Sequence, residues 1–284
     1  MSTVAPATPR ALPKRSESPL REPNKRWTRF ILPTYTMVMI VYLSLPIFVM
    51  ILYSFNDIPG DRQTSQFWGF TLDWWKNIFN IPGLPEAFKN SLLIAPISAV
   101  FATALGTLFG LALGRYRFRG LVWVDFVIFL AIAVPEIVLG SSLLSMFVLA
   151  NVPLGLYTIL LSHIGFSIAF VAVTVRARVQ GLDRNLEDAA QDLFASPIVS
   201  FFKVTLPLIA PAILAGFLLA FVLSLDDFVI TNFVAGQETT FPLWVFGAQR
   251  IGIPPQVNVM GTLLFGAGIL AAVTSVLAQR RRGR

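Results

Sequence analysis

Six long apolar blocks constrain the fold of this 284-residue chain more than any other feature of its sequence. An α-helix rises about 1.5 Å per residue, so roughly 20 apolar residues cross the hydrocarbon core of a bilayer. None of the blocks alternates apolar and polar residues as the strands of a membrane barrel do. We therefore expect an all-α polytopic membrane protein with six transmembrane helices, over residues 30–53, 91–114, 121–149, 155–175, 207–232 and 257–279.

The composition excludes most other classes of protein. Hydrophobic residues make up 55% of the chain, charged residues only 13%, and the mean hydropathy is +0.71. A water-soluble protein of this length needs more polar residues to cover its surface. The chain has no Cys and one His, which excludes disulfides and cysteine or multi-histidine metal sites, so no metal is expected.

The basic residues predict the orientation in the membrane. Eighteen of the 22 Lys and Arg residues lie in four segments, 1–29, 115–120, 176–206 and 280–284. The positive-inside rule then places both termini in the cytoplasm, with 1–29 as a disordered basic tail and 280–284 as a short basic tail. Topology thus explains the net charge of +7, and no nucleic-acid partner is expected.

Ionisable residues within the spans are candidate functional residues, because burying them in a bilayer is costly. Glu136 follows Pro135, which breaks the helix ladder; this carboxylate either lines a water-filled path or lies at an interface. His163 lies in mid-span, where we favour an interhelical hydrogen bond over a proton or substrate contact. Asp226 and Asp227 point about 100° apart on a helix, so one is expected to face the bundle and the other an interface or loop.

The segment 176–206 is the longest predicted cytoplasmic connection between spans. Asn185 is a candidate cap for a helix that carries Leu186, Ala189, Ala190 and Leu193 on one face and acidic residues in its first turn. Ser196-Pro197 predicts a break, followed by a second short helix over about 197–206. The apolar side of this helix–turn–helix needs a partner protein to cover it.

Several catalytic motifs are missing from the sequence. There is no P-loop, no nucleophile elbow and no H-E-x-x-H motif, so the chain is expected to be a transport subunit without an ATPase site of its own rather than an enzyme. An autonomous channel or secondary carrier is the competing class. Inverted repeats would favour a carrier, and co-purification with an ATPase would separate the two classes.

The loop resembles the cytoplasmic coupling loop of bacterial ABC importer permeases. That family has a Glu-Ala-Ala run, a Gly six positions after the Glu, and a later Leu-Pro pair; this chain has Asp188-Ala189-Ala190 and Leu206-Pro207. Phe194 stands at the position of the family Gly. A bulky residue adopts a positive φ only at a cost, so we expect the turn to begin later, at Ser196-Pro197. The resemblance assigns the contact with an ATPase to Leu186, Glu187, Asp188, Ala189, Ala190, Leu193, Phe194, Ser196, Pro197, Leu206 and Pro207.

The resemblance extends through most of residues 30–280. The stretch 224–258, which begins SLDDFVITNF, narrows it to the second permease subunit of spermidine/putrescine importers. Related permeases for iron(III), aminoethylphosphonate and other small solutes share much of the pattern and stay as alternatives. The resemblance implies a type I ABC importer permease fold in the bacterial cytoplasmic membrane. It also implies a second permease, two cytoplasmic subunits that bind ATP and Mg, and an extracytoplasmic substrate-binding protein, with no cofactor in this chain.

The charges in the spans indicate the sign of the substrate. As drawn, the spans contain Asp125, Glu136, Asp226 and Asp227 and no Lys or Arg. A polyamine cation would be met by these carboxylates and by aromatic faces. The candidate path residues are Glu136, Asp226, Asp227, Phe228, Phe233 and Trp244.

Overall fold

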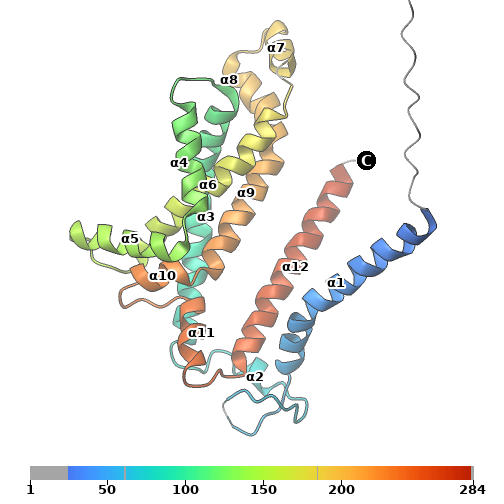
Figure 1. Ribbon diagram of the computed structural model, residues 1–284, viewed down its shortest axis with the longest axis vertical. Coiled ribbons are helices and arrows are strands. Elements are labelled where there is room, and N and C mark those ends of the chain that lie inside the picture. The colour runs from blue at the N-terminus through green and yellow to red at the C-terminus, as the bar shows by residue number, and fades with distance from the viewer. Residues whose placement is uncertain (1–24, 61, 184, 283–284) are drawn as a thin grey trace, which may run out of the picture.

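The computed structural model describes residues 25–60, 62–183 and 185–282, and the side chains within them from residue 30 to residue 270, with Val273. Apart from one isolated bridge between Asn56 and Phe70, every regular element in these residues is a helix (Figure 1). The prediction of an all-α fold is confirmed. The elements are α1 (Lys25–Tyr53), α2 (Asp73–Lys76), α3 (Leu84–Arg115), α4 (Leu121–Ala133), α5 (Glu136–Leu149), α6 (Leu156–Gln180), α7 (Asn185–Asp192), α8 (Pro197–Ser200), a π-helical turn (Phe201–Thr205), α9 (Leu206–Asp226), α10 (Val229–Val234), α11 (Phe241–Gln249) and α12 (Gln256–Arg282).

Four described helical stretches are long and apolar enough to cross a membrane: 30–53 of α1, α3, α6, and the run from Pro197 to Asp226 that ends in α9. The bent pair of α4 and α5 provides a fifth span if it is counted as one. Of α12, the described apolar part is Gln256–Leu270. The exact number of six spans and the orientation of the termini therefore stay predictions. Of the two predicted tails, residues 1–24 and 283–284 lie outside the described residues, and residues 25–29 and 280–282 belong to α1 and α12.

The block 121–149 does not form the single span predicted for it. α4 ends at Ala133 and α5 begins at Glu136, with a bend of 105° between them. Pro135 has no N–H to continue the helix ladder, and its ring disfavours helical backbone at Val134, which is extended at φ −66° and ψ 130°. Figure 1 shows the result: α5 projects sideways from the bundle at mid-height.

The block 207–232 is also interrupted, which corrects the predicted span. α9 ends at Asp226, Asp227 has extended backbone at ψ 121°, and α10 begins at Val229. α10 packs against α5, where a Cβ at Gly140 would lie 2.6 Å from the Phe233 ring. Two broken spans thus meet side by side in the middle of the molecule.

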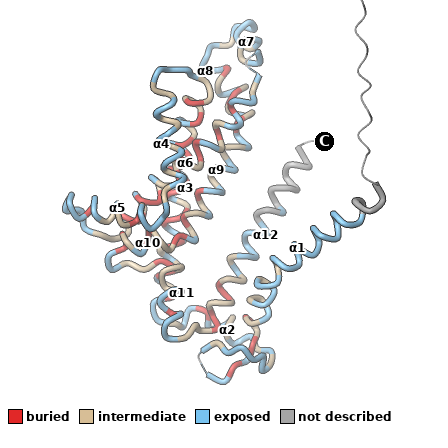
Figure 2. Tube along the Cα trace, in the orientation of Figure 1, coloured by how far each residue is buried: buried red, intermediate tan, exposed pale blue. Residues whose placement is uncertain are grey.

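α3, α6 and α9 form the central bundle, and their contact faces hold the buried residues of Figure 2. Small residues on α3 let the backbones of α3 and α6 approach closely, as is common where helices pack inside a bilayer. A Cβ at Gly110 would lie 2.8 Å from the Ala172 carbonyl oxygen of α6. The close contact runs along three glycines spaced four apart on α3 that face three valines of α6: Gly106, Gly110 and Gly114 against Val171, Val175 and Val179.

α1 and α12 pack on each other, and over most of their length they lie apart from the bundle (Figure 1). The start of α12 is the exception, because Val259 and Met260 share a buried cluster with Leu84 of α3. The described apolar side chains of α1 are nearly all exposed (Figure 2). The lower end of α1 is held by α2: Trp74 Nε1 donates to the Asn56 carbonyl at 2.8 Å, and Trp75 Nε1 donates to the Ser54 carbonyl at 3.1 Å. α2 itself is a single helical turn.

Candidate coupling site and substrate path

The coupling loop begins with α7 at one end of the molecule, beyond the bundle (Figure 1). The first turn of α7 carries Glu187 and Asp188, whose charges interact favourably with the helix N-terminus. Asn185, the predicted cap, is instead the first residue of α7, and the Asp183 carboxylate accepts its backbone N–H at 3.0 Å. Ala189 and Ala190 follow on the same helix.

α7 ends in a Schellman motif with Phe194 in the position that usually holds a glycine. The Ala195 N–H donates to the Ala190 carbonyl at 3.1 Å, and the Phe194 N–H donates to the Gln191 carbonyl at 2.9 Å. Phe194 has φ +65°, in the left-handed region, where a non-glycine residue costs about 1–3 kcal/mol. The prediction that the turn begins only at Ser196-Pro197 is therefore wrong, because Phe194 itself makes the turn.

The second helix of the loop leads directly into the fifth span. The Ser196 side chain accepts the Val199 N–H at 3.4 Å and so caps α8, in which Pro197 is the first residue. α8 continues through the π-helical turn into α9, whose first turn contains Leu206 and Pro207. The predicted separate helix over 197–206 is thus the start of one continuous helical run, and a displacement of the loop acts directly on a span.

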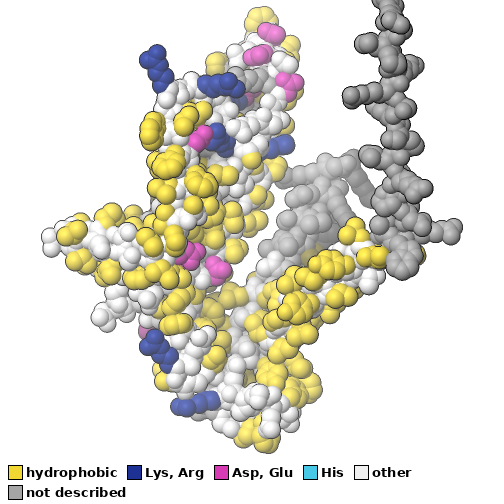
Figure 3. Space-filling view, in the orientation of Figure 1, with side chains coloured by type: hydrophobic (Ala, Val, Ile, Leu, Met, Phe, Trp, Pro, Cys, Tyr) yellow, Lys and Arg dark blue, Asp and Glu magenta, His cyan; other side chains and the backbone are white. Residues whose placement is uncertain are grey.

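The apolar side chains of the loop are uncovered in the single chain. Leu193 is 82% exposed, Phe194 is 99% exposed and Ile198 is 71% exposed. Leu206, by contrast, packs against the core of the bundle. Figure 3 shows acidic side chains gathered over α7 at this end of the molecule. The loop therefore offers a surface that combines apolar side chains with carboxylates.

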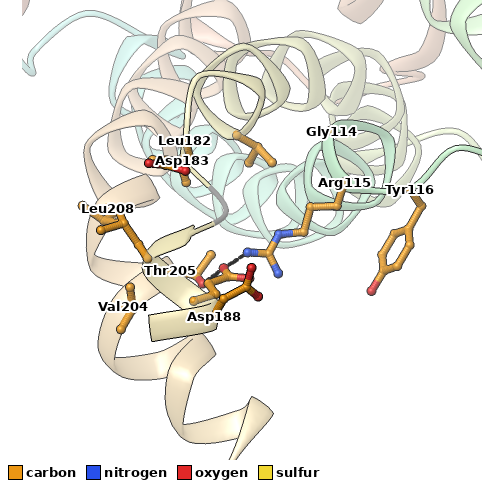
Figure 4. Close-up of a pocket in the computed structure, with 12 residues that line it drawn as sticks. Gly114, Arg115, Tyr116, Leu182, Asp183, Asp188, Val204, Thr205 and Leu208 are labelled. Carbon is orange, nitrogen blue, oxygen red and sulfur yellow. Dashed lines mark hydrogen bonds and ion pairs between the residues drawn. The ribbon is translucent and has the colours of Figure 1, made fainter. Parts of the chain in front are cut away.

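An ion pair joins the loop to the bundle. Arg115, at the end of α3, pairs with Glu187 and donates to the Thr205 hydroxyl at 3.3 Å; Thr205 in turn donates to Glu187. These side chains lie beside a cavity of about 340 Å³ beneath α7, and Figure 4 shows Arg115 reaching toward Thr205. The sequence reasoning missed Arg115 and Thr205. The position of Arg115 as the first basic residue after an apolar block was the available signal.

The candidate path carboxylates have different environments. Glu136 is the first residue of α5 and Asp226 the last residue of α9, and both are exposed. Each lies four residues before a residue of the contact between α5 and α10: Gly140 follows Glu136 along α5, and Ile230 follows Asp226 across the helix break. Figure 3 shows acidic side chains at mid-height on the side of the bundle that faces α12. These two carboxylates are free to meet a solute at the two helix breaks.

Asp227 is instead buried in a hydrogen-bond network around His163, which is 1% exposed. His163 Nε2 lies 3.2 Å from Asp227 Oδ2, and Nδ1 lies 2.7 Å from Ser224 Oγ, which accepts from Ser98 Oγ at 2.8 Å. Asp227 also accepts the Thr231 N–H at 2.8 Å. The interhelical hydrogen bond predicted for His163 is confirmed, as is the division between a bundle-facing and an exposed aspartate.

One direction follows from the chemistry of the two groups. An ionised carboxylate only accepts, so His163 donates from Nε2 to Asp227. The contact between His163 Nδ1 and Ser224 Oγ links this pair to Ser98 on α3. Each side chain of this network, which links α3, α9, α6 and the break between α9 and α10, has a hydrogen-bond partner. Such a network holds the helices that it joins in one arrangement.

The three aromatic path candidates do not gather around the two exposed carboxylates. Phe228 lies between α9 and α10 with its ring centroid 4.2 Å from that of Phe246. Phe233 is partly buried against the core of α5 and α10. Trp244 donates to the Pro82 carbonyl at 3.3 Å and lines a separate cavity of about 690 Å³. Phe233 and Trp244 thus contribute packing. Of the three, only Phe228 lies next to one of the candidate carboxylates in sequence, because it follows Asp227.

Asp125, the remaining acidic residue of the predicted spans, already forms an ion pair within this chain. Arg176 donates to Asp125 from both terminal nitrogens, because α6 continues to Gln180 rather than ending at residue 175 as predicted. The helix thereby places an arginine opposite Asp125. The acidic excess in the spans is smaller than the sequence suggests. Among the described residues, no group of three or more His, Asp and Glu side chains is arranged to hold a metal ion.

Comparison with known proteins identifies the family. The family described as "Binding-protein-dependent transport system inner membrane component" matches residues 106–280. The chain is 39% identical over 240 residues to the spermidine/putrescine transport system permease protein PotC of Escherichia coli (strain K12), covering 84% of this chain and 90% of that protein. It is 38% identical over 255 residues to the putrescine transport system permease protein PotI of the same organism, covering 86% of this chain and 90% of the relative.

A solved structure agrees in fold. A bacterial ABC transporter described as importing the acidic polysaccharide alginate contains a chain that superposes with a TM-score of 0.63 at 16% identity, over 93% of this chain and 99% of that one. The solved structure thus supports the helical fold, and the sequence relatives show the family. The chain belongs to the family of binding-protein-dependent transport system inner membrane components, as a permease subunit of an ABC importer.

Proposed function

We propose that this permease carries a polyamine, such as spermidine or putrescine, across the bacterial cytoplasmic membrane. The observation that carries the proposal is the 39% identity, over 84% of this chain, to a spermidine/putrescine permease. The exposed Glu136 and Asp226 at the two helix breaks support a cationic solute, because carboxylates without a bound cation are costly in a membrane interior.

The chain works as half of a pathway by alternating access. A second permease completes the pathway, a binding protein delivers the solute from outside, and two cytoplasmic ATPase subunits bind ATP and Mg. The coupling loop over 176–206 seats in a groove of one ATPase subunit. Closure of the ATPases on ATP pushes α7 and α8, and the continuous run of α8 into α9 carries the push to the spans.

Stimulation of ATP hydrolysis tests the substrate. The complete complex, with its binding protein, is reconstituted in lipid and titrated with spermidine, putrescine and an iron(III) chelate. We expect a polyamine to stimulate hydrolysis several-fold and the iron chelate to leave it at the basal rate. Stimulation by iron, or by none of the three solutes, contradicts the polyamine assignment.

Charge introduced into the loop tests the coupling. Leu193→Arg or Asp188→Arg is expected to abolish uptake while the variant still inserts and assembles with its partner permease, because neither side chain is buried in this chain. Phe118→Arg, an exposed change in the turn between α3 and α4 and outside the loop, is the control. Normal uptake by both loop variants removes the loop from the mechanism.

The orientation of the termini is tested by labelling. The chain has no cysteine, so single cysteines report without background. Gln191→Cys in α7 is expected to react with a membrane-impermeant maleimide only in inverted vesicles, and Thr64→Cys only in intact cells. The opposite pattern reverses the proposed topology.

A further inference from the structure

Phe194 has an unfavourable backbone conformation, and its exposed side chain does not pack against the rest of this chain to compensate for that cost. Its φ of +65° places it in the left-handed region, which suits glycine, and its side chain is 99% exposed. Strained residues of this kind persist at functional sites, where the strain serves the function. The structure therefore presents an aromatic ring at the turn between α7 and α8, where a glycine would close the same Schellman motif without strain.

The surroundings of the ring indicate its partner. Leu193 and Ile198 on either side are also strongly exposed, and we name these two residues and Phe194 the coupling tip. Residues 185–202 contain Glu187, Asp188 and Asp192 and no Lys or Arg. Glu187 is paired with Arg115, which leaves exposed carboxylates at Asp188 and Asp192 next to the apolar tip.

We infer that the Phe194 ring inserts into an apolar socket of the ATPase subunit, that basic side chains at the rim of the socket meet Asp188 and Asp192, and that this ring determines which ATPase the permease accepts. The inference rests on the proposed function, in which the loop seats on an ATPase. It adds the residue that dominates the contact and the chemistry of the surface that receives it. Buried aromatic side chains surrounded by weaker contacts commonly dominate protein interfaces.

A lipid surface is the less favourable partner. The inner leaflet is anionic and repels the exposed carboxylates of α7. α7 also lies at the far end of the molecule, beyond the ends of α3 and α4 (Figure 1). A protein groove with basic residues at its rim satisfies both the apolar tip and its carboxylates.

The ring also provides specificity by exclusion. A socket shaped around a glycine turn has no room for a phenyl group, so an ATPase that serves a glycine-containing permease clashes with Phe194. A socket that accepts the ring is left partly empty by a glycine-containing permease. Both effects separate the cognate pair from other permease–ATPase pairs in the same cell.

Substitutions at Phe194 separate the ring from the backbone. The permease pair is placed in lipid nanodiscs, and binding of the ATPase subunit from the same import system is measured by biolayer interferometry. Phe194→Gly is expected to weaken binding about 10- to 100-fold, as for loss of a dominant interface residue. Its unfolding midpoint is expected not to fall, because the ring has no contacts to lose and glycine relieves the strain of the positive φ. Phe194→Tyr keeps the ring and is expected to bind within about threefold of the wild type.

Two controls locate the effect. Phe118→Gly removes an exposed aromatic ring from the turn between α3 and α4 and is expected to leave binding unchanged. Leu193→Arg tests the loop as a whole. If Leu193→Arg abolishes binding and Phe194→Gly does not weaken it, the inference is wrong and the proposed coupling stands; if neither variant changes binding, the proposed coupling is wrong as well.

A fluorescent label tests the alternative location in lipid. The cysteine-free chain allows Phe194→Cys to carry a bimane label in nanodiscs that contain brominated lipids. We expect little quenching before the ATPase is added and a blue shift of the emission after it binds. Strong quenching by the lipid that persists after the ATPase is added overturns the inference in favour of the membrane.

Discussion

Arg115, the last residue of α3, forms an ion pair with Glu187 in the first turn of α7. The two side chains are only 29% and 22% exposed, so their attraction is screened less by water than that of a surface pair. Thr205, just before α9, contacts both. α7 is therefore attached to the central bundle at a point where α3 and α9 meet.

Breaking this pair is expected to weaken coupling. Glu187→Gln removes the charge but keeps the shape, so the permease is expected to assemble, to bind its ATPase and to lose about tenfold in uptake per ATP hydrolysed. The physical reason is that α7 then moves without carrying α3. Uptake and hydrolysis are measured together in proteoliposomes.

The charge-reversed pair and a surface arginine are the controls for this prediction. Arg115→Glu together with Glu187→Arg is expected to recover part of the coupling that each single reversal loses. Arg119→Gln alters an exposed arginine in the following turn and is expected to behave as wild type. Full coupling in Glu187→Gln would show that the ion pair has no mechanical role.

Removal of the His163 imidazole is expected to destabilise the protein by about 2–3 kcal/mol. His163→Phe leaves Asp227 and the Ser224 hydroxyl buried without their shared partner, and unsatisfied buried polar groups carry that order of penalty. Thermal unfolding in detergent measures the change. Thr103→Val is the matched control, because the Thr103 hydroxyl is buried without a partner and its loss is expected to be neutral or stabilising. Equal stability of His163→Phe and wild type would contradict the network.

The two exposed carboxylates are expected to affect transport without affecting stability. Asp226→Asn and Glu136→Gln should each raise the polyamine concentration for half-maximal uptake about tenfold, since a charge-assisted hydrogen bond to a cation contributes roughly 1.5–3 kcal/mol. Uptake of radiolabelled spermidine is measured beside the unfolding midpoint. Asp227→Asn is the contrasting variant and is expected to lower the midpoint, because Asp227 is buried. Unchanged uptake in the Asp226 and Glu136 double variant would make these groups structural.

The glycine contact between α3 and α6 gives a further prediction. Gly110→Ala places a Cβ 2.8 Å from the Ala172 carbonyl oxygen and 2.9 Å from Val175, so α3 must move away from α6. We expect a loss of about 1–3 kcal/mol, as for overpacking of a core. Gly165→Ala, on α6 with nothing within 4 Å, is the control and is expected to be neutral or stabilising. The unfolding midpoints of the two variants decide the point.

Hydropathy predicted the long helices because spanning a bilayer requires a long apolar segment whatever its neighbours are. The break at Pro135 was also predictable, since proline removes a backbone donor wherever it occurs. The angle of 105° was not, because the packing of α5 on α10 sets it. The pair of Asp125 and Arg176 was missed for a related reason: α6 continues five residues past its apolar block, and hydropathy cannot show how far a helix continues beyond the membrane.

The candidate site was likewise predictable only in part from the sequence. The coupling loop has a local sequence pattern, so its two helices and the break between them were predicted from the sequence, with errors at Asn185 and at the start of the turn. Phe194 misled the prediction because its preference for φ < 0 is a tendency that the Schellman hydrogen bonds of α7 override. The grouping of His163 with Ser98, Ser224 and Asp227 joins residues far apart in the chain, and no local pattern reports it.

The glycine seam between α3 and α6 has a mechanical consequence. Where the backbones of two helices touch, no layer of side chains lies between them to slide or compress. We therefore expect α3 and α6, with α9 packed on both, to move as one rigid unit. α1 and α12 pack on each other outside this unit. We expect the bending that accompanies transport to fall on the two segments that connect this unit to the outer pair, residues 54–83 and 235–255, so the length and stiffness of these segments should limit how far the unit rotates.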